Sequence, residues 1–260
     1  MRLLAVALTL AACLHAAVNA AAEDVDLELV LLADASRSID NAEIRFQREG
    51  YATAITHPEV LAAIASGYLQ RIAVTYVEWG DASSQEVVVP WTVIDGPESA
   101  AAFAETLLAT PRRAQGPNAI GSALAAAQAL IQGNAIEGTR KVIDFSADSA
   151  FTLGGVPMAE ARAAALAAGI VINGLAILCR HDDCSGRPVD YDLESAFAAL
   201  ITGGPASFVV TVDDRASFAE AVRRKLLLEI AGIEPAYPPD AQRFVTATPV
   251  SAPPRAGDVD

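Results

Sequence analysis

Apolar and polar positions along this chain alternate between two kinds of segment. Short aliphatic runs have the composition of buried strands, and longer segments repeat apolar residues at helical spacing. The segment Ile72–Trp79, for example, alternates and is rich in β-branched residues, as strands are. The pattern predicts strands at residues 29–33, 72–79, 86–93, 141–145, 170–178 and 207–212. It predicts helices at residues 41–55, 59–64, 97–108, 119–131, 158–168, 192–200 and 214–230.

The order of these segments predicts the fold class. Strands that alternate with helices indicate an α/β fold with a doubly wound, mostly parallel sheet and helices on both faces. The strands at 72–79 and 86–93 are separated only by the turn Gly80–Ser84, which predicts a hairpin. Pro90 lacks an amide proton and therefore favours an edge position. We expect residues 86–93 to form one antiparallel edge strand.

The two ends of the chain differ in composition from the middle. Met1 and Arg2 precede an apolar core, Leu3–Ala12, that is too short to span a bilayer, as in a signal peptide. Cleavage is expected at Ala20 or Ala22. The final segment is rich in Pro, Ala, Asp and Thr without apolar periodicity, which predicts disorder. The predicted organisation is a signal peptide at 1–22, one domain at 23–232 and a disordered tail at 233–260.

The cysteines bear on where the protein is located. Cys179 and Cys184 lie close together, and in an exported protein such a pair predicts a disulfide that closes a loop. The sharper alternative is a metal site that includes His181, but these three ligands make an incomplete tetrahedral set. Cys13 follows a sequence similar to a lipobox, so lipid anchoring is the alternative to periplasmic or secreted export.

Composition excludes some classes of partner. The formal net charge is −14, and such a surface repels nucleic acid phosphates and anionic lipids. The chain is 53% hydrophobic, which allows a sizeable core, yet no later stretch is long and apolar enough for a transmembrane helix. Arg112 and Arg113 could contact an acidic partner, but charged loop residues usually face water and we expect them to be solvated.

The candidate chemistry lies where the first predicted strand ends. The aliphatic run at 29–33 leads directly into Asp34, Ser36 and Ser38, whose alternation can direct three oxygen atoms into one space. In open α/β sheets, ligands bind at the carboxyl ends of strands. One carboxylate and two hydroxyls are hard ligands that suit Mg²⁺ or Mn²⁺. The alternative interpretation is a cluster that only caps the next helix.

Asp34-Ala35-Ser36-Arg37-Ser38 after a hydrophobic strand resembles the metal-ion-dependent adhesion site of von Willebrand factor type A domains. Two later loops fit the same pattern, Gly116–Leu124 and Val142–Asp148. The chain is most similar to secreted bacterial proteins of this type with no assigned function. The resemblance implies that one Mg²⁺ or Mn²⁺ ion is completed by an Asp or Glu of a protein partner. The implied ligands are Asp34, Ser36, Ser38, Asn118 and Asp148.

One departure from the family pattern keeps a second interpretation open. Asn118 stands where the pattern has Thr; an amide oxygen can ligate a hard cation, but it is longer and differently placed. The alternative is therefore a scaffold of the same fold with a degenerate, metal-free site. Asp144 lies inside a predicted strand, which favours a structural role, whereas Asp148 follows that strand and is the better site residue.

A third alternative is an enzyme. A Mg²⁺-dependent phosphatase of the haloacid dehalogenase type also begins from an Asp after the first strand, but it needs a second Asp where this chain has Ser36. Neither a Gly-x-Ser-x-Gly nucleophile motif nor a Gly-x-Gly-x-x-Gly dinucleotide loop is found in the expected places. We therefore expect a binding module and no catalytic activity.

Overall fold

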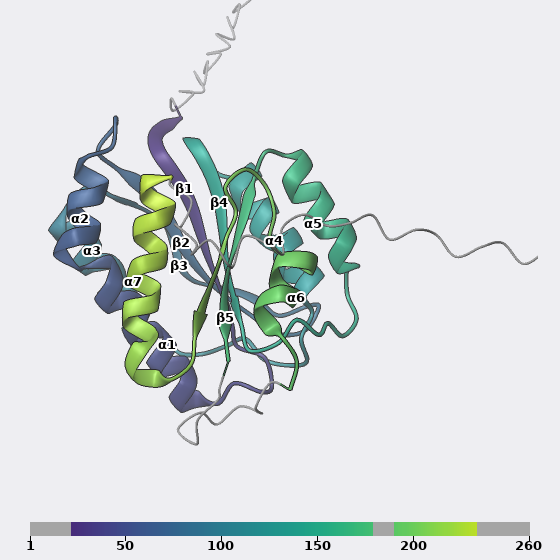
Figure 1. Cartoon of the computed structure of the whole chain (residues 1–260). Helices are drawn as coiled ribbons and strands as arrows, with labels where there is room; N and C mark the ends of the chain where they lie inside the picture. The colour runs from purple at the N-terminus through teal and green to yellow at the C-terminus, as the bar shows by residue number, and fades with distance from the viewer. Residues whose placement is uncertain (1–21, 179–189, 233–260) are drawn as a thin grey trace, which may run out of the picture.

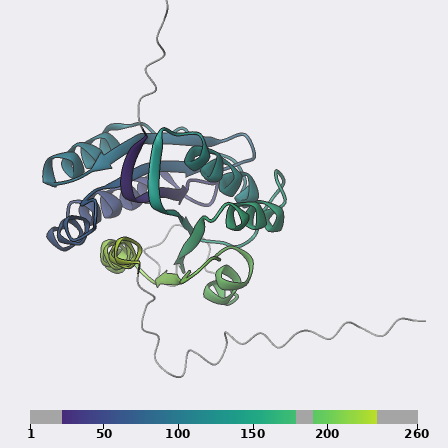
Figure 2. The ribbon, with the colours of Figure 1, turned by 90° about the horizontal axis from the view of Figure 1, so that it is seen from above.

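The computed structural model describes residues 22–178 and 190–232. A central sheet lies between two layers of helices, seen from the side in Figure 1 and from above in Figure 2. The strands are β1 (Glu23–Asp34), β2 (Ile72–Trp79), β3 (Gln85–Ile94), β4 (Ile136–Ala147), β5 (Val171–Ile177) and β6 (Val209–Val212). The helices are α1 (Asn41–Ile55), α2 (Pro58–Ala65), α3 (Pro97–Ala109), α4 (Ile120–Gln132), α5 (Met158–Ala167), α6 (Leu193–Leu200) and α7 (Arg215–Ala231).

The sheet has the predicted doubly wound, mostly parallel architecture. Its strand order is β3-β2-β1-β4-β5-β6. Strand β3 is antiparallel to β2 and forms the edge, and the other neighbouring pairs are parallel. The edge position accommodates Pro90, which has no amide proton to donate. From β1 the chain continues to β2 on one side, while β4 lies on the other side, so the strand order reverses between β1 and β4.

Strands β1 and β4 are longer than their aliphatic runs predict. Glu23 pairs with Ile136 and Val25 pairs with Gly138, so the two strands run side by side well before their apolar segments begin. These first residues include charged side chains, which obscure the strand pattern in the sequence. Pairing with a neighbouring strand extends each element beyond the apolar run that predicted it.

Each face of the sheet has its own hydrophobic core. Helices α1, α2, α3 and α7 cover one face, where Tyr51, Phe103 and Phe218 are buried. Helices α4, α5 and α6 cover the other face, where Phe145 and Phe197 are buried. Figure 2 shows the two helical layers on opposite sides of the sheet. Burial on both faces explains why the central strands read as nearly continuous apolar runs.

Several predictions fall on residues outside the described ranges. They concern the signal peptide, Cys13, the pairing of Cys179 with Cys184, and the tail at 233–260. In the described ranges, no helix combines the length and hydropathy needed to cross a bilayer.

Candidate functional site

The predicted site begins at Asp34, the last residue of β1. The Ser36 amide donates a 2.8 Å hydrogen bond to Oδ1 of Asp34, which folds the chain into a tight Asx turn. The side chain of Gln47 on α1 donates to the Asp34 carbonyl at 3.2 Å. Asp40 then caps α1, and Glu43 completes the capping box. These contacts bury Asp34 completely at the carboxyl end of the strand.

Hydrogen bonds draw three loops together at this end of the sheet. The Arg37 amide donates to the Gly116 carbonyl at 2.8 Å, which joins the loop after β1 to the loop before α4. The Leu153 amide donates to the Asn118 carbonyl at 2.5 Å, which joins that second loop to the loop after β4. The site therefore lies at the reversal of strand order, where open α/β sheets bind ligands.

The structure brings four of the five predicted ligand side chains into one cluster. Oγ of Ser36 lies 3.3 Å from Oγ of Ser38; Ser36 is buried and Ser38 is exposed. Asp148, one residue past β4, is 5% exposed and interacts with Ser38 and with Asp34. Asn118 is half-buried, and in the described part of the chain its hydrogen bonds are made by its main-chain carbonyl.

Burial disfavours the ionised form of both acids, and the charge of Asp148 adds to this effect at Asp34. Burial, and then the negative charge of Asp148, raise the pKa of Asp34 to about 8. Burial also raises the pKa of Asp148, against the opposing effect of its hydrogen bond with Ser38. No donor in the described residues forms a hydrogen bond to Oδ2 of Asp34 or Oδ1 of Asp148. The cluster therefore presents two buried carboxylate oxygens that lack a partner.

Other buried carboxylates contrast with this pair. Seven are buried in the described part of the chain: Glu28, Asp34, Glu43, Glu78, Asp144, Asp148 and Glu229. Four of them form ion pairs with Lys or Arg, at 2.7 Å for Glu78, Asp144 and Glu229 and at 3.6 Å for Glu28. Asp144 pairs with Lys225, in agreement with the structural role expected for it. Within the described residues, no Lys or Arg forms an ion pair with Asp34 or Asp148.

The residues present fit a divalent cation with oxygen ligands. Two carboxylates would balance its charge, and the adjacent hydroxyls would add neutral ligands of the kind that hard cations prefer. Bound metal would also satisfy the two unpaired carboxylate oxygens. The described residues contain no cluster of three or more His, Cys, Asp or Glu suited to a metal, so ligands of other types, such as the hydroxyls of Ser36 and Ser38, would have to complete the coordination.

Arg112 is a site residue that the sequence did not reveal, and the prediction that it is solvated is wrong. Its guanidinium donates to the carbonyls of Ala35 at 2.6 Å, Ile39 at 2.9 Å and Ala114 at 3.1 Å. These bonds brace the loop that carries Ser36, and Arg113 remains exposed as expected. Every residue type has a main-chain carbonyl, so the partners of Arg112 cannot be recognised from the sequence, and nothing in the sequence indicated this role.

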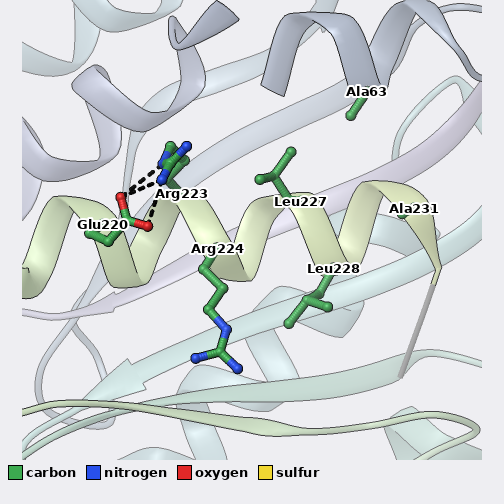
Figure 3. A pocket seen from close by; sticks show the side chains of 7 residues that line it. All are labelled: Ala63, Glu220, Arg223, Arg224, Leu227, Leu228 and Ala231. Carbon is green, nitrogen blue, oxygen red and sulfur yellow. Dashed lines mark hydrogen bonds and ion pairs between the residues drawn. The ribbon is translucent and has the colours of Figure 1, made fainter. Parts of the chain in front are cut away.

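A shallow groove on another surface contains none of the predicted site residues. It has a volume of about 390 Å³ and is lined by Ala63 of α2 and by α7 side chains from Glu220 to Ala231. Figure 3 shows Leu227 pointing toward Ala63, and Glu220 paired with Arg223 along the helix. Arg223 also pairs with Glu59 of α2, and the groove lies apart from the carboxyl ends of the strands where Asp34 and Asp148 meet, so it is not the candidate site.

Solved structures of von Willebrand factor type A domains share this fold. A domain from Catenulispora acidiphila is 18% identical with a TM-score of 0.54, and the match covers 80% of this chain and 43% of that chain. The pilus adhesin SpaC from Lactobacillus rhamnosus GG, in an open conformation, is 15% identical with a TM-score of 0.54, over 80% of this chain and 30% of that chain.

A third similar structure holds a metal. Proximal thread matrix protein 1 from the mussel byssus, described with a zinc-occupied metal-ion-dependent adhesion site, is 17% identical with a TM-score of 0.53. The match covers 81% of this chain and 49% of that chain, so this chain spans about half the length of that relative. No curated protein matches the chain. The chain has the von Willebrand factor type A fold, and its residues 24–234 belong to the family described as protein of unknown function DUF1194.

Proposed function

We propose that this protein is an exported module that binds a protein partner through a divalent cation. The proposed ligands are Asp34, Ser36, Ser38, Asn118 and Asp148. The observation that carries the proposal is the pair of buried carboxylates, Asp34 and Asp148, which has unpaired oxygens and no basic partner in the described residues. A cation from solution would supply the missing positive charge.

The chain's own residues would hold this cation while leaving it attractive to another anion. Asp34 and Asp148 would contribute the negative charge, whereas Ser36 and Ser38 would contribute neutral oxygen ligands. A divalent cation with so few charged ligands keeps an appreciable positive potential. A carboxylate of the partner, from an exposed Asp or Glu, would complete the coordination. Mg²⁺ or Mn²⁺ is proposed because both prefer oxygen ligands.

The similar structures support a divalent cation without selecting one. The mussel protein carries zinc at its adhesion site, and SpaC is described as a pilus adhesin. The proposal adds that a signal peptide at residues 1–22 directs export to the periplasm or medium, with a lipid anchor at Cys13 as the alternative. The module is proposed to lack catalytic activity because Ser36 stands where the phosphatase-type mechanism needs an acid.

Calorimetric titration with Mg²⁺, Mn²⁺ and Zn²⁺ tests the proposal directly. We expect saturable binding by the wild type and no binding by Asp34→Ala. The matched control is Asp95→Ala, which removes an exposed aspartate near the start of α3 and should leave binding unchanged. If the wild type binds none of the three cations while its circular dichroism shows a folded protein, the site is degenerate and the module is a metal-free scaffold.

A further inference from the structure

The loop between β4 and α5 exposes a set of large apolar side chains. Phe151 is 63% exposed, Leu153 is 49% exposed and Val156 is 37% exposed. Tyr191 is 45% exposed and joins them, because its hydroxyl accepts a 2.9 Å hydrogen bond from the Ala150 amide. These four are half of the eight large apolar side chains that are exposed in the described ranges. We refer to these four residues as the apolar rim.

The main chain beneath the apolar rim is tied to several other elements. The Leu153 amide bonds the Asn118 carbonyl at 2.5 Å, and the Val156 amide bonds Oγ of Ser122 on α4 at 3.1 Å. Oγ1 of Thr152 accepts from the Ile120 amide at 3.2 Å at the start of α4. With its backbone fixed in this way, the loop presents its apolar side chains in a preorganised arrangement, which lowers the entropic cost of binding a partner.

The apolar rim borders the proposed cation site. Phe151 lies three residues after Asp148, and Leu153 holds the loop that contains Asn118. From Ser149 to Pro157 the loop contains no charged residue, although the whole chain has a net charge of −14. On the side formed by this loop, a partner that reaches the cation therefore meets an uncharged, apolar surface.

We propose that the apolar rim selects partners whose exposed carboxylate is flanked by bulky apolar side chains. This inference rests on the proposed function, because the cation is what engages the carboxylate. The cation would bind any accessible Asp or Glu, so the apolar neighbours supply the discrimination. Exposed aromatic side chains such as Phe151 and Tyr191 are typical of protein interfaces, and exposed apolar patches mark interaction sites. A second copy of this chain fits less well, because two strongly acidic surfaces repel each other.

A displayed library of short random peptides with a fixed central glutamate tests this inference on the full chain in the presence of Mg²⁺. With the wild type we expect Phe, Leu, Tyr, Trp and Met to be enriched about tenfold beside the glutamate, as about 1.4 kcal/mol of added binding energy would produce. The double variant Phe151→Ser and Leu153→Ser should lose this enrichment and retain its affinity for the cation. The matched control, Tyr68→Ser with Leu108→Ser, changes two exposed apolar residues elsewhere and should behave as the wild type.

Three results would overturn the inference while cation binding remains intact. The first is selection of peptides without apolar flanks, and the second is the same enrichment with the double variant. The third is a dimer of the wild type, seen by light scattering, that the double variant makes monomeric. Should the double variant lose the cation, Phe151→Ser alone is used instead, since Leu153 also holds Asn118. Failure of the proposed function is distinct: calorimetry then detects no cation, or a library with a central glutamine is selected equally well.

Discussion

Two pairs of buried acids near the sheet differ in whether a basic side chain lies beside them. Asp144 and Glu229 share the ammonium of Lys225, whose Nζ lies 2.7 Å from each carboxylate, and Asn173 donates to Glu229 at 3.0 Å. Asp34 and Asp148 have no such cation in the described part of the chain. Since an unpaired buried charge is costly, the second pair depends on protons or on a cation from solution.

The difference follows from position along a single strand. Asp144 lies inside β4, where its side chain is enclosed between the sheet and α7 and can be reached by Lys225. Asp148 lies one residue beyond the strand, where three loops meet and solvent is near. The first pair, through Lys225, links α7 to the sheet, whereas the second is the pair proposed to bind an external cation. Only three residues of the chain therefore lie between a structural acid and a proposed binding acid.

The largest expected effect on stability comes from removing the ammonium group of Lys225. Lys225→Met leaves Asp144 and Glu229 buried without their shared positive charge, and breaking a buried pair in this way costs about 3–5 kcal/mol. Urea unfolding would measure the loss. Combining this change with Asp144→Asn and Glu229→Gln should restore much of the stability. A loss below about 1 kcal/mol would show that the cluster does not need its ammonium.

Asp34→Asn should have opposite effects with and without metal. Without metal it removes a buried acid whose pKa is raised to about 8, so the variant should be at least as stable as the wild type at pH 8. At a cation concentration about 100 times Kd, the wild type should gain about 2.7 kcal/mol and the variant nothing. Thermal unfolding with and without Mn²⁺ measures both effects, with Asp95→Asn as the control. An equal gain in the variant would place the cation elsewhere.

The buried pair of Asp144 and Glu229 should also make the free energy of unfolding depend on pH. Burial, and then the charge of Asp144, raise the pKa of Glu229 from 4.5 to about 7, despite the opposing effect of Lys225. The folded protein thus holds more protons than the unfolded chain between these values. The contribution of Glu229 to stability should be largest below pH 4.5 and be lost as the pH rises through 7, by up to about 1.4 kcal/mol per pH unit.

Glu229→Gln isolates this dependence, because an amide oxygen can still accept from Lys225 and Asn173 but does not titrate in this range. Unfolding free energies of the variant and the wild type, measured in the absence of metal, should diverge steadily across the interval. Parallel curves for the two proteins would mean that Glu229 does not titrate differently in the folded state.

The smallest expected effect concerns Asn118. Asn118→Thr replaces the longer amide with the hydroxyl found in the family pattern, and we expect cation affinity to rise by up to about tenfold, or about 1.4 kcal/mol. Asn118→Ala is the paired variant and should weaken binding if the amide oxygen ligates the metal. Calorimetry compares the three proteins, and identical affinities would remove Asn118 from the ligand set.

Local pattern predicted much of this molecule. The helix at 41–55 and the strand at 72–79 match α1 and β2, because periodicity and capping residues act within a few positions. The cluster of Asp34, Ser36 and Ser38 was predictable for the same reason, since all three lie in one turn. The first halves of β1 and β4 were missed because pairing with another strand defines them.

The roles of Lys225 and Arg112 were beyond prediction. Lys225 stands among other charged residues of α7, and only the packing of α7 against β4 shows that it is completely buried. Arg112 binds main-chain carbonyls, which every residue type provides. Contacts of this kind depend on which distant segments the topology brings together.

The sequence by itself determined the alternation of strands and helices, the antiparallel edge and the candidate oxygen ligands. These features depend on hydrophobic burial and turn chemistry within short stretches of chain. Only the tertiary structure decided that strand order reverses between β1 and β4, and so brings Asp34 and Asp148 to one place. The tertiary structure alone also decided which buried carboxylates form ion pairs with Lys or Arg, because the interaction of two charges depends on their distance in space and not on their separation along the chain.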